Sequence, residues 1–258
     1  MVRRDTETAD RFRAELQDHY LSIGVPTHFS WRSPIGARQY GYLFSILGAF
    51  APPGTAVLDW GCGDGVFSLW LASQGCRVSG LEFYPPVLDP VIQETSPGLW
   101  DFHMAEEPVK LPYEDHSFDL VLSIGVLEHV RDTGGTESGS LAEVKRVLRP
   151  GGRFVCYHFP NRGSWIEFAA RRTRSKNWHR QRYSKREVSD LFRGSGFEID
   201  ETFRYGLLPR NSVPCPTSPR WARALADVYD FLDTGGQRIA NGLVQNHLVV
   251  CRPRPGIA

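Results

Sequence analysis

Residues 56–65 combine three glycines with a preceding apolar run in a pattern suited to holding a nucleotide-like ligand. The apolar residues predict a short buried strand, and Gly61, Gly63 and Gly65 follow it at every second position. Glycines at this spacing let the backbone turn sharply and lie against a ligand, because no Cβ stands in the way. Such a loop at the carboxyl end of a strand is where open α/β sheets bind nucleotides.

Two carboxylates indicate which kind of nucleotide-like ligand the loop would hold. Glu82 ends a second predicted strand, where it can accept hydrogen bonds from a ribose diol, each contributing roughly 1.5–3 kcal/mol. Dinucleotide-binding proteins use the same device, but their loop has the spacing G-x-G-x-x-G, whereas residues 61–65 follow G-x-G-x-G. Asp59, at the end of the first strand, would repel a pyrophosphate but accept an amino group and a sulfonium. The pattern therefore favours an amino-acid-bearing nucleoside.

Further segments follow in the order of a known family. With the glycine loop and Glu82, residues 111–122, 126–130 and 146–154 resemble the motifs of class I S-adenosylmethionine-dependent methyltransferases. Within that class, residues 126–130 and the segment 161–165 are similar to the ubiquinone-biosynthesis O-methyltransferases. The likeness covers about residues 40–160, and it is more specific for the cofactor than for the acceptor.

The resemblance implies S-adenosyl-L-methionine as the cofactor and assigns a set of residues to it. Glu106 and Glu107 are both eligible to meet the adenine amino group, because an insertion precedes Leu111. Phe83 either packs on the adenine or belongs to the core. The full set is Asp59, Gly61, Cys62, Gly63, Gly65, Glu82, Phe83, Glu106, Glu107 and Ser123.

His129 and Glu128 are the candidate catalytic residues. Methyl transfer from a sulfonium is an in-line displacement, so the protein mainly positions the acceptor and manages its proton. His129 follows the fourth predicted strand, and a neutral imidazole can act as a general base near pH 7. The alternative is a structural histidine that caps the loop. Glu128 orients His129 or the acceptor, or is a solvated or helix-start acid.

No metal is expected from this segment. In the ubiquinone-type enzymes a second glutamate lies three residues before the position of Glu128, and the pair is implicated in metal binding. Here that earlier position is Gly125. One carboxylate and one histidine are too few ligands for Mg²⁺, which prefers several oxygens.

The segment 171–182 is rich in arginine and holds no acid. Because guanidinium groups pair bidentately with phosphates and carboxylates, we expect Arg180 and Arg182 to meet an anionic acceptor. That acceptor would be phosphorylated, nucleotide-linked, tethered to a carrier or held at an anionic membrane surface. Trp165 and Tyr40 are expected to wall the acceptor pocket. The alternatives are a solvated basic face and ordinary core aromatics.

The elements that must position these residues alternate between strand and helix patterns, which predicts an α/β fold. We expect a Rossmann-like, doubly wound, mostly parallel seven-stranded sheet with helices on both faces and a small helical lid. The resemblance implies that the last strand is antiparallel and lies next to the sixth. Strands are expected near 55–60, 77–82, 100–103, 118–123, 152–158, from 196 onward and 247–251, and helices near 5–23, 37–50, 65–74, 85–94, 139–149, 164–173, 184–194 and 219–239.

Three regions are expected along the chain. Residues 1–53 form an N-terminal helical lid and residues 54–160 the cofactor-binding core. Residues 161–258 complete the same domain, with the basic segment and a lid insertion at 206–240.

Composition excludes several function classes. A net charge of +1 over 258 residues exerts no general attraction on nucleic acid, so no nucleic-acid partner is expected. The five cysteines are scattered without a C-x-x-C pair, which favours a reducing cytoplasm. No apolar run is long enough to span a bilayer, although peripheral membrane contact stays open.

We therefore predict a cytoplasmic, S-adenosylmethionine-dependent methyltransferase in biosynthesis that acts at a hydroxyl of a small molecule. The alternatives are N- or C-methylation, or a non-catalytic nucleoside-binding protein of the same fold. A nicotinamide-dependent oxidoreductase is a further alternative, and binding of NAD would identify it.

Overall fold

The computed structural model describes residues 2–173, 178–211 and 213–255, which form two compact units. The helical unit combines residues 2–50 with 205–244, and the sheet unit combines residues 51–204 with 245–255. In the described parts of both units, no helix has the length and apolar character needed to cross a membrane.

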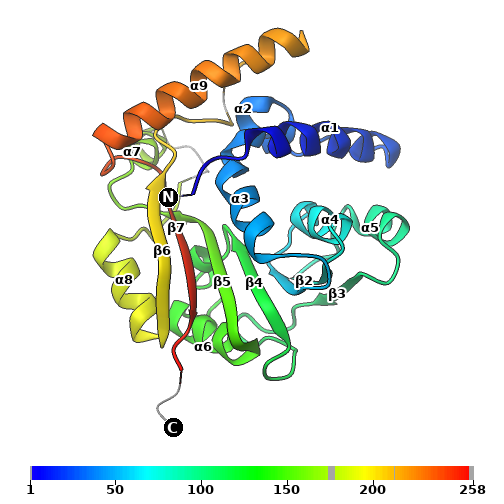
Figure 1. Ribbon diagram of the computed structural model, residues 1–258. Coiled ribbons are helices and arrows are strands. Elements are labelled where there is room, and N and C mark those ends of the chain that lie inside the picture. Colours follow the sequence, from blue (N-terminus) through cyan, green and yellow to red (C-terminus); the bar gives the residue numbers. More distant parts are fainter. Residues whose placement is uncertain (1, 174–177, 212, 256–258) are drawn as a thin grey trace. The chain divides into compact units, whose positions relative to one another are not determined.

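The sheet unit contains a seven-stranded sheet with the order β3-β2-β1-β4-β5-β7-β6 (Figure 1). Strands β1 to β5 pair in parallel, and β7 lies antiparallel to β5, between β5 and β6. This confirms the predicted mostly parallel sheet and its inserted last strand. The strands are β1 (Ala56–Trp60), β2 (Arg77–Glu82), β3 (Trp100–Met104), β4 (Phe118–Ile124), β5 (Leu148–Pro160), β6 (Phe197–Tyr205) and β7 (Asn246–Pro253).

Alternation along β1 distributes its side chains over two faces of the sheet. Ala56, Leu58 and Trp60 join a buried apolar cluster with α6 (Glu137–Val147) and α8 (Lys185–Gly194). Asp59 points to the opposite face because successive strand residues alternate, and there it accepts a hydrogen bond from Ser68 of α4 (Val66–Ser73). Helices therefore cover both faces. The remaining elements of this unit are α5 (Asp89–Thr95), η3 (Leu127–His129) and α7 (Trp165–Arg172).

The strand order reverses at β1, and this reversal locates the site. From β1 the chain moves outward to β2 and β3, and then returns to β4 on the other side of β1. In the register of the sheet Trp60 lies beside both Leu81 and Ser123, so the loops that follow β1, β2 and β4 emerge together. Open α/β sheets bind ligands in the crevice outside the carboxyl ends of strands at such a reversal.

The helical unit consists of α1 (Thr6–Ser22), η1 (Phe29–Trp31), α2 (Pro34–Ala37), η2 (Arg38–Tyr40), α3 (Gly41–Phe50) and α9 (Pro219–Ile239). The single helix predicted over 37–50 is in fact three pieces that begin earlier. Ser33 caps α2 by accepting a hydrogen bond from the amide of Gly36, and Pro34 occupies the first turn, where its missing N–H costs no hydrogen bond. Trp31 is buried and stacks on Tyr40 with ring centroids 5.0 Å apart.

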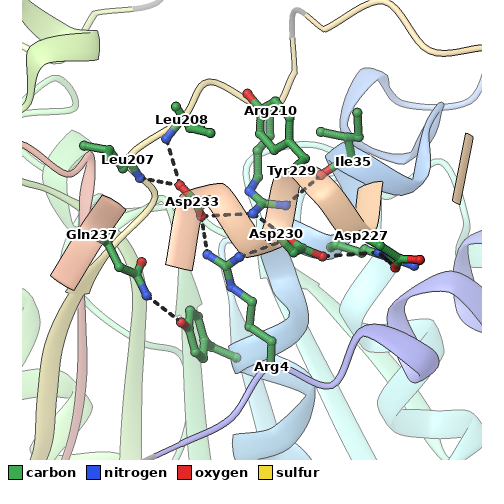
Figure 2. A network of polar contacts seen from close by, with 12 residues as sticks. Arg4, Ile35, Leu207, Leu208, Arg210, Asp227, Tyr229, Asp230, Asp233 and Gln237 are labelled. Atoms are coloured by element: carbon green, nitrogen blue, oxygen red, sulfur yellow. Dashed lines mark hydrogen bonds and ion pairs between the residues drawn. The ribbon is translucent and has the colours of Figure 1, made fainter. Parts of the chain in front are cut away.

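Buried ion pairs hold the two stretches of the helical unit together (Figure 2). Arg4, near the start of the chain, pairs with Asp230 at 3.0 Å and with Asp233. Arg210 pairs with the same two carboxylates at 2.6 and 2.9 Å. Arg38 adds a pair with Asp230 at 3.3 Å. These charged groups are almost completely buried, so breaking one pair would leave an unpaired charge away from water. The ion pairs therefore hold residues 205–244 specifically against the N-terminal helices.

Candidate functional site

A cavity of about 370 Å³ lies at the strand-order reversal of the sheet unit. Its walls come from the loops after β1, β2, β3 and β4, and its volume is in the range of small-molecule sites. Among the sequence-predicted residues, Gly61, Gly63, Glu82, Phe83, Glu107 and His129 line it. The loops predicted to bind a cofactor and the residue predicted to act on the acceptor therefore share one cavity.

The backbone at Gly61 is shaped by two neighbouring loops. The amides of Gly61 and Cys62 donate hydrogen bonds to the carbonyl of Leu81 at 2.8 and 3.3 Å, which ties the glycine loop to the end of β2. Gly61 has φ +72°, and a Cβ there would lie 2.3 Å from Cγ2 of Val126. A glycine is required because the turn after β4 occupies the space of a side chain.

Glu82 faces the cavity with its carboxylate held by two backbone amides. Its Oε2 accepts from Gly63 at 3.2 Å, and its Oε1 accepts from Phe83 at 2.8 Å. A carboxylate has further lone pairs, so it can still accept hydrogen bonds from a ligand diol. Phe83 beside it is about half exposed, which leaves its ring surface open to a flat ligand group.

Other residues of the predicted cofactor set do not line the cavity. Asp59 is buried against Ser68, and this burial raises its pKa to about 6 although the Ser68 hydroxyl donates to it at 2.7 Å. Cys62 is nearly buried, and burial raises the pKa of its thiol. Ser123 is fully buried. None of these three side chains is part of the cavity lining.

Two adjacent glutamates, both eligible from the sequence, occupy different surroundings. Glu107 lines the cavity and Glu106 does not. Gly65 also lies outside the lining, with φ +85° at the start of α4, where it turns the chain into the helix.

Sequence reasoning missed several lining residues. Trp60, Tyr84, Lys110 and Thr133 contribute to the walls. Lys110 lies in the insertion before Leu111, and its position three residues after Glu107 was the available signal.

His129 sits on η3, at the turn after β4, with its ring half exposed at the cavity wall. Its Nδ1 lies 3.0 Å from Oδ2 of Asp132. This carboxylate favours a proton on Nδ1, and it thereby leaves the Nε2 lone pair free to accept a proton or bind a cation.

Glu128 and His179 lie next to His129. The His179 ring centroid is 5.4 Å from that of His129. Glu128 is only 3 % exposed, and no group of another described residue donates a hydrogen bond to either carboxylate oxygen. Burial raises the pKa of Glu128 to about 7. Glu128 lies in the first turn of η3, as the helix-start alternative expects, but it is not a solvated acid.

Glu167 anchors His179 from α7. Its two carboxylate oxygens accept from the backbone amide of His179 at 2.8 Å and contact the ring Nδ1 at 2.9 Å. Burial opposes the charged form of both partners, but their pairing raises the pKa of His179 and lowers that of Glu167. The basic segment is thus attached to the body of the sheet unit at its His179 end.

None of the four residues predicted to contact the acceptor is part of the cavity lining. Trp165 begins α7 and is partly exposed, Arg180 is exposed, and Arg182 is half-buried. Tyr40 belongs to the helical unit and is buried against Trp31, so its ring packs in a core. Residues 174–177 of the basic segment lie outside the described residues.

Known proteins resemble this chain both in sequence and in fold. Residues 58–156 match the profile of a family described as a methyltransferase domain. A probable S-adenosylmethionine-dependent methyltransferase of Mycolicibacterium smegmatis is 33% identical over 152 residues, which cover 58% of this chain and 54% of that protein. A demethylmenaquinone methyltransferase of Deinococcus radiodurans is 33% identical over 152 residues, covering 57% and 56%. The chain spans little more than half the length of these curated relatives.

A solved structure shares the fold over nearly the whole chain. The 1,6-didemethyltoxoflavin-N1-methyltransferase of Burkholderia thailandensis, with bound S-adenosylhomocysteine, superposes with a TM-score of 0.53 at 18% identity, covering 99% of this chain and 92% of that one. The comparisons support S-adenosylmethionine as the cofactor, while the finer likeness to the ubiquinone-biosynthesis enzymes stays a prediction. The comparisons therefore support a methyltransferase domain over residues 58–156, and the chain shares its fold with S-adenosylmethionine-dependent methyltransferases.

Proposed function

We propose that this protein transfers a methyl group from S-adenosylmethionine to a hydroxyl of a small molecule. One observation carries the proposal: the glycine loop, Glu82 and His129 line the same cavity. The first two features suit the nucleoside end of the cofactor, and the third suits an acceptor. When bound, S-adenosylmethionine supplies a methyl group already activated on a sulfonium.

The residues of the chain then bind the cofactor and control the proton of the acceptor. Glu82 holds the ribose diol through hydrogen bonds, and the apolar surface of Phe83 packs beside the base. His129 governs the proton of the acceptor hydroxyl, because its Nε2 is left as an acceptor by the contact between Nδ1 and Asp132. General-base assistance of this kind typically contributes 10²–10⁴-fold to the rate.

The acceptor carries negative charge in this proposal. Lys110 in the cavity lining and the guanidinium groups of Arg180 and Arg182 support an anionic group such as a phosphate or carboxylate. Replacing both arginines by glutamate is expected to raise the KM of an anionic acceptor and abolish its salt dependence, with the cofactor affinity unchanged.

Calorimetry with S-adenosylhomocysteine and with NAD tests the cofactor part. Binding of the former alone supports the proposal, whereas binding of NAD alone identifies an oxidoreductase.

Labelled methyl transfer tests the reaction. Phenols, sugar phosphates and their matched amines serve as acceptors. We expect label in the hydroxyl compounds and a loss of at least about 100-fold in kcat for His129→Gln, with S-adenosylhomocysteine affinity retained. A loss below about tenfold, or transfer to the amines alone, contradicts the assigned role of His129.

A further inference from the structure

Three potential metal ligands converge beside the cavity from segments far apart in the chain. Glu128 and His129 belong to η3, and His179 lies about 50 residues later. One ligand atom from each side chain lies within 4.8 Å of the other two. Glu128 and His129 alone are too few ligands for a metal, but the fold brings His179 beside them as a third potential ligand.

Both histidines are oriented by a carboxylate on the same ring atom. Asp132 contacts Nδ1 of His129 at 3.0 Å, and Glu167 contacts Nδ1 of His179 at 2.9 Å. This leaves Nε2 of each ring as the free donor. Metal-ligating histidines commonly have their second ring nitrogen held by a carboxylate in this way, which fixes the tautomer and the ring orientation.

The Glu128 carboxylate is the second, independent observation. It is 3 % exposed and directed into the cluster, and neither oxygen receives a hydrogen bond from another described residue. A buried carboxylate normally has a hydrogen-bond or charge partner. A bound cation would satisfy both oxygens.

The charge balance also favours a cation. Asp132, Glu167 and Glu128 place three carboxylates around two imidazoles. Arg182 opposes them through its effect on His179. Without a metal ion, a protonated His179 between Glu128 and Glu167 would supply the positive charge for these carboxylates instead.

We propose that Glu128, His129 and His179 bind a divalent transition-metal ion of the Zn²⁺ type. Two imidazoles and one carboxylate are a donor set that suits Zn²⁺ or Fe²⁺ and leaves open coordination positions, whereas Mg²⁺ prefers oxygen ligands. Metal–ligand bonds of about 2.0–2.2 Å require donor atoms roughly 3–4 Å apart, so the side chains close by about 1 Å on binding.

An ion held by Glu128, His129 and His179 would lie beside the cavity wall, because His129 is part of the cavity lining. His129 and Gly125 line the cavity, and a Cβ at Gly125 would lie 3.7 Å from Oε1 of Glu128. An ion held there would bind the acceptor oxygen and ease loss of its proton, so His129 would act through the ion. This role at the acceptor rests on the proposed function; the binding of the ion does not.

Titration of the chelator-treated full-length protein tests the site without any turnover. Calorimetry with Zn²⁺ is expected to show one equivalent bound, and Co²⁺ is expected to give the visible absorption of a low-symmetry site. His179→Gln and Glu128→Gln should each weaken Zn²⁺ binding at least tenfold, and Glu167→Gln should weaken it about 10–100-fold. His103→Gln, at an exposed position outside the cluster, is the matched control and should bind like the wild type.

Each other outcome overturns the proposal. If the wild type binds no Zn²⁺, or if His179→Gln and Glu128→Gln bind it as the wild type does, the cluster is a proton-bridged triad instead. The Co²⁺ spectrum of the unmutated protein keeps the test valid should a variant fail to fold. S-adenosylhomocysteine titration with chelator present tests the proposed function separately, so the two failures are distinguishable.

Discussion

The carboxylate of Glu82 accepts a hydrogen bond from the backbone amide of Gly63, 19 residues earlier in the chain, at 3.2 Å. This contact joins the glycine loop after β1 to the end of β2 across one wall of the cavity. Glu82 therefore has two roles: it orders the loop, and it presents its remaining lone pairs to a ligand.

We predict that Glu82→Ala lowers the affinity for S-adenosylhomocysteine about 10–100-fold, because hydrogen bonds to a charged group contribute roughly 1.5–3 kcal/mol. Calorimetry measures the change. Glu107→Ala should also weaken binding, whereas Glu106→Ala should not, since only Glu107 of this pair lines the cavity. Equal effects at Glu106 and Glu107 would contradict the assignment.

We predict that Gly61→Ala destabilises the protein by about 2–4 kcal/mol, which urea unfolding measures. The left-handed backbone costs about 1–2 kcal/mol, and the contact with Val126 adds an overpacking cost of about 1–3 kcal/mol. Gly151→Ala isolates the first contribution, because Gly151 has φ +81° and no heavy atom lies within 4 Å of its added Cβ.

The double variant Gly61→Ala/Val126→Ala tests the packing contribution. If the losses of unfolding free energy in the two single variants simply add in the double variant, the close approach of Val126 is not the cause of the loss in Gly61→Ala. Recovery of part of the stability confirms that the turn after β4 excludes a side chain at position 61.

Asp233→Asn should destabilise the helical unit by about 3 kcal/mol, because Arg4 and Arg210 lose a buried counter-charge. Asp233 is fully buried, and it also accepts from the amides of Leu207 and Leu208 at 2.7 and 2.8 Å. Chemical unfolding followed by circular dichroism measures the loss. Asp227→Asn is the control: its side chain is 70% exposed, so a change below about 1 kcal/mol is expected. If Asp233→Asn and Asp227→Asn lost similar amounts of unfolding free energy, the burial of Asp233 would not be the reason for its effect.

His247 should make stability depend on pH. Burial lowers its pKa to about 4, and its Nε2 lies 2.8 Å from the carbonyl of Tyr183. The folded state thus favours the neutral ring, so this stability is present above pH 6.5 and is lost as pH falls toward 4. The loss between pH 7 and pH 5 is about 2 kcal/mol.

Glutamine at position 247 keeps an N–H donor but does not titrate. We therefore expect His247→Gln to show a smaller drop in unfolding free energy between pH 7 and pH 5 than the wild type. His103→Gln should leave the drop unchanged. An identical drop in all three proteins would rule out His247 as the source.

Local patterns were sufficient to predict the elements and part of the site. The short apolar run before Gly61, bounded by turn residues, is typical of a buried strand, and such a run is a property of neighbouring residues. The helices over 219–239 and 184–194 were predicted almost to the residue for the same reason. Where the pattern was interrupted, as between Pro34 and Gly41, the predicted boundary was wrong because a capping serine and a proline started a separate short helix.

The sequence by itself determined the order of strands and helices, the glycine loop and the carboxylate of Glu82, because each depends on residues close together in the chain. Tertiary structure decided which distant residues meet. Arg4 reaches Asp230 across 226 positions, and His179 comes to Glu128 from the segment between α7 and α8. Contacts between distant residues depend on how the chain connections cross and on which face each helix buries. The periodicity of a local segment contains no information about either.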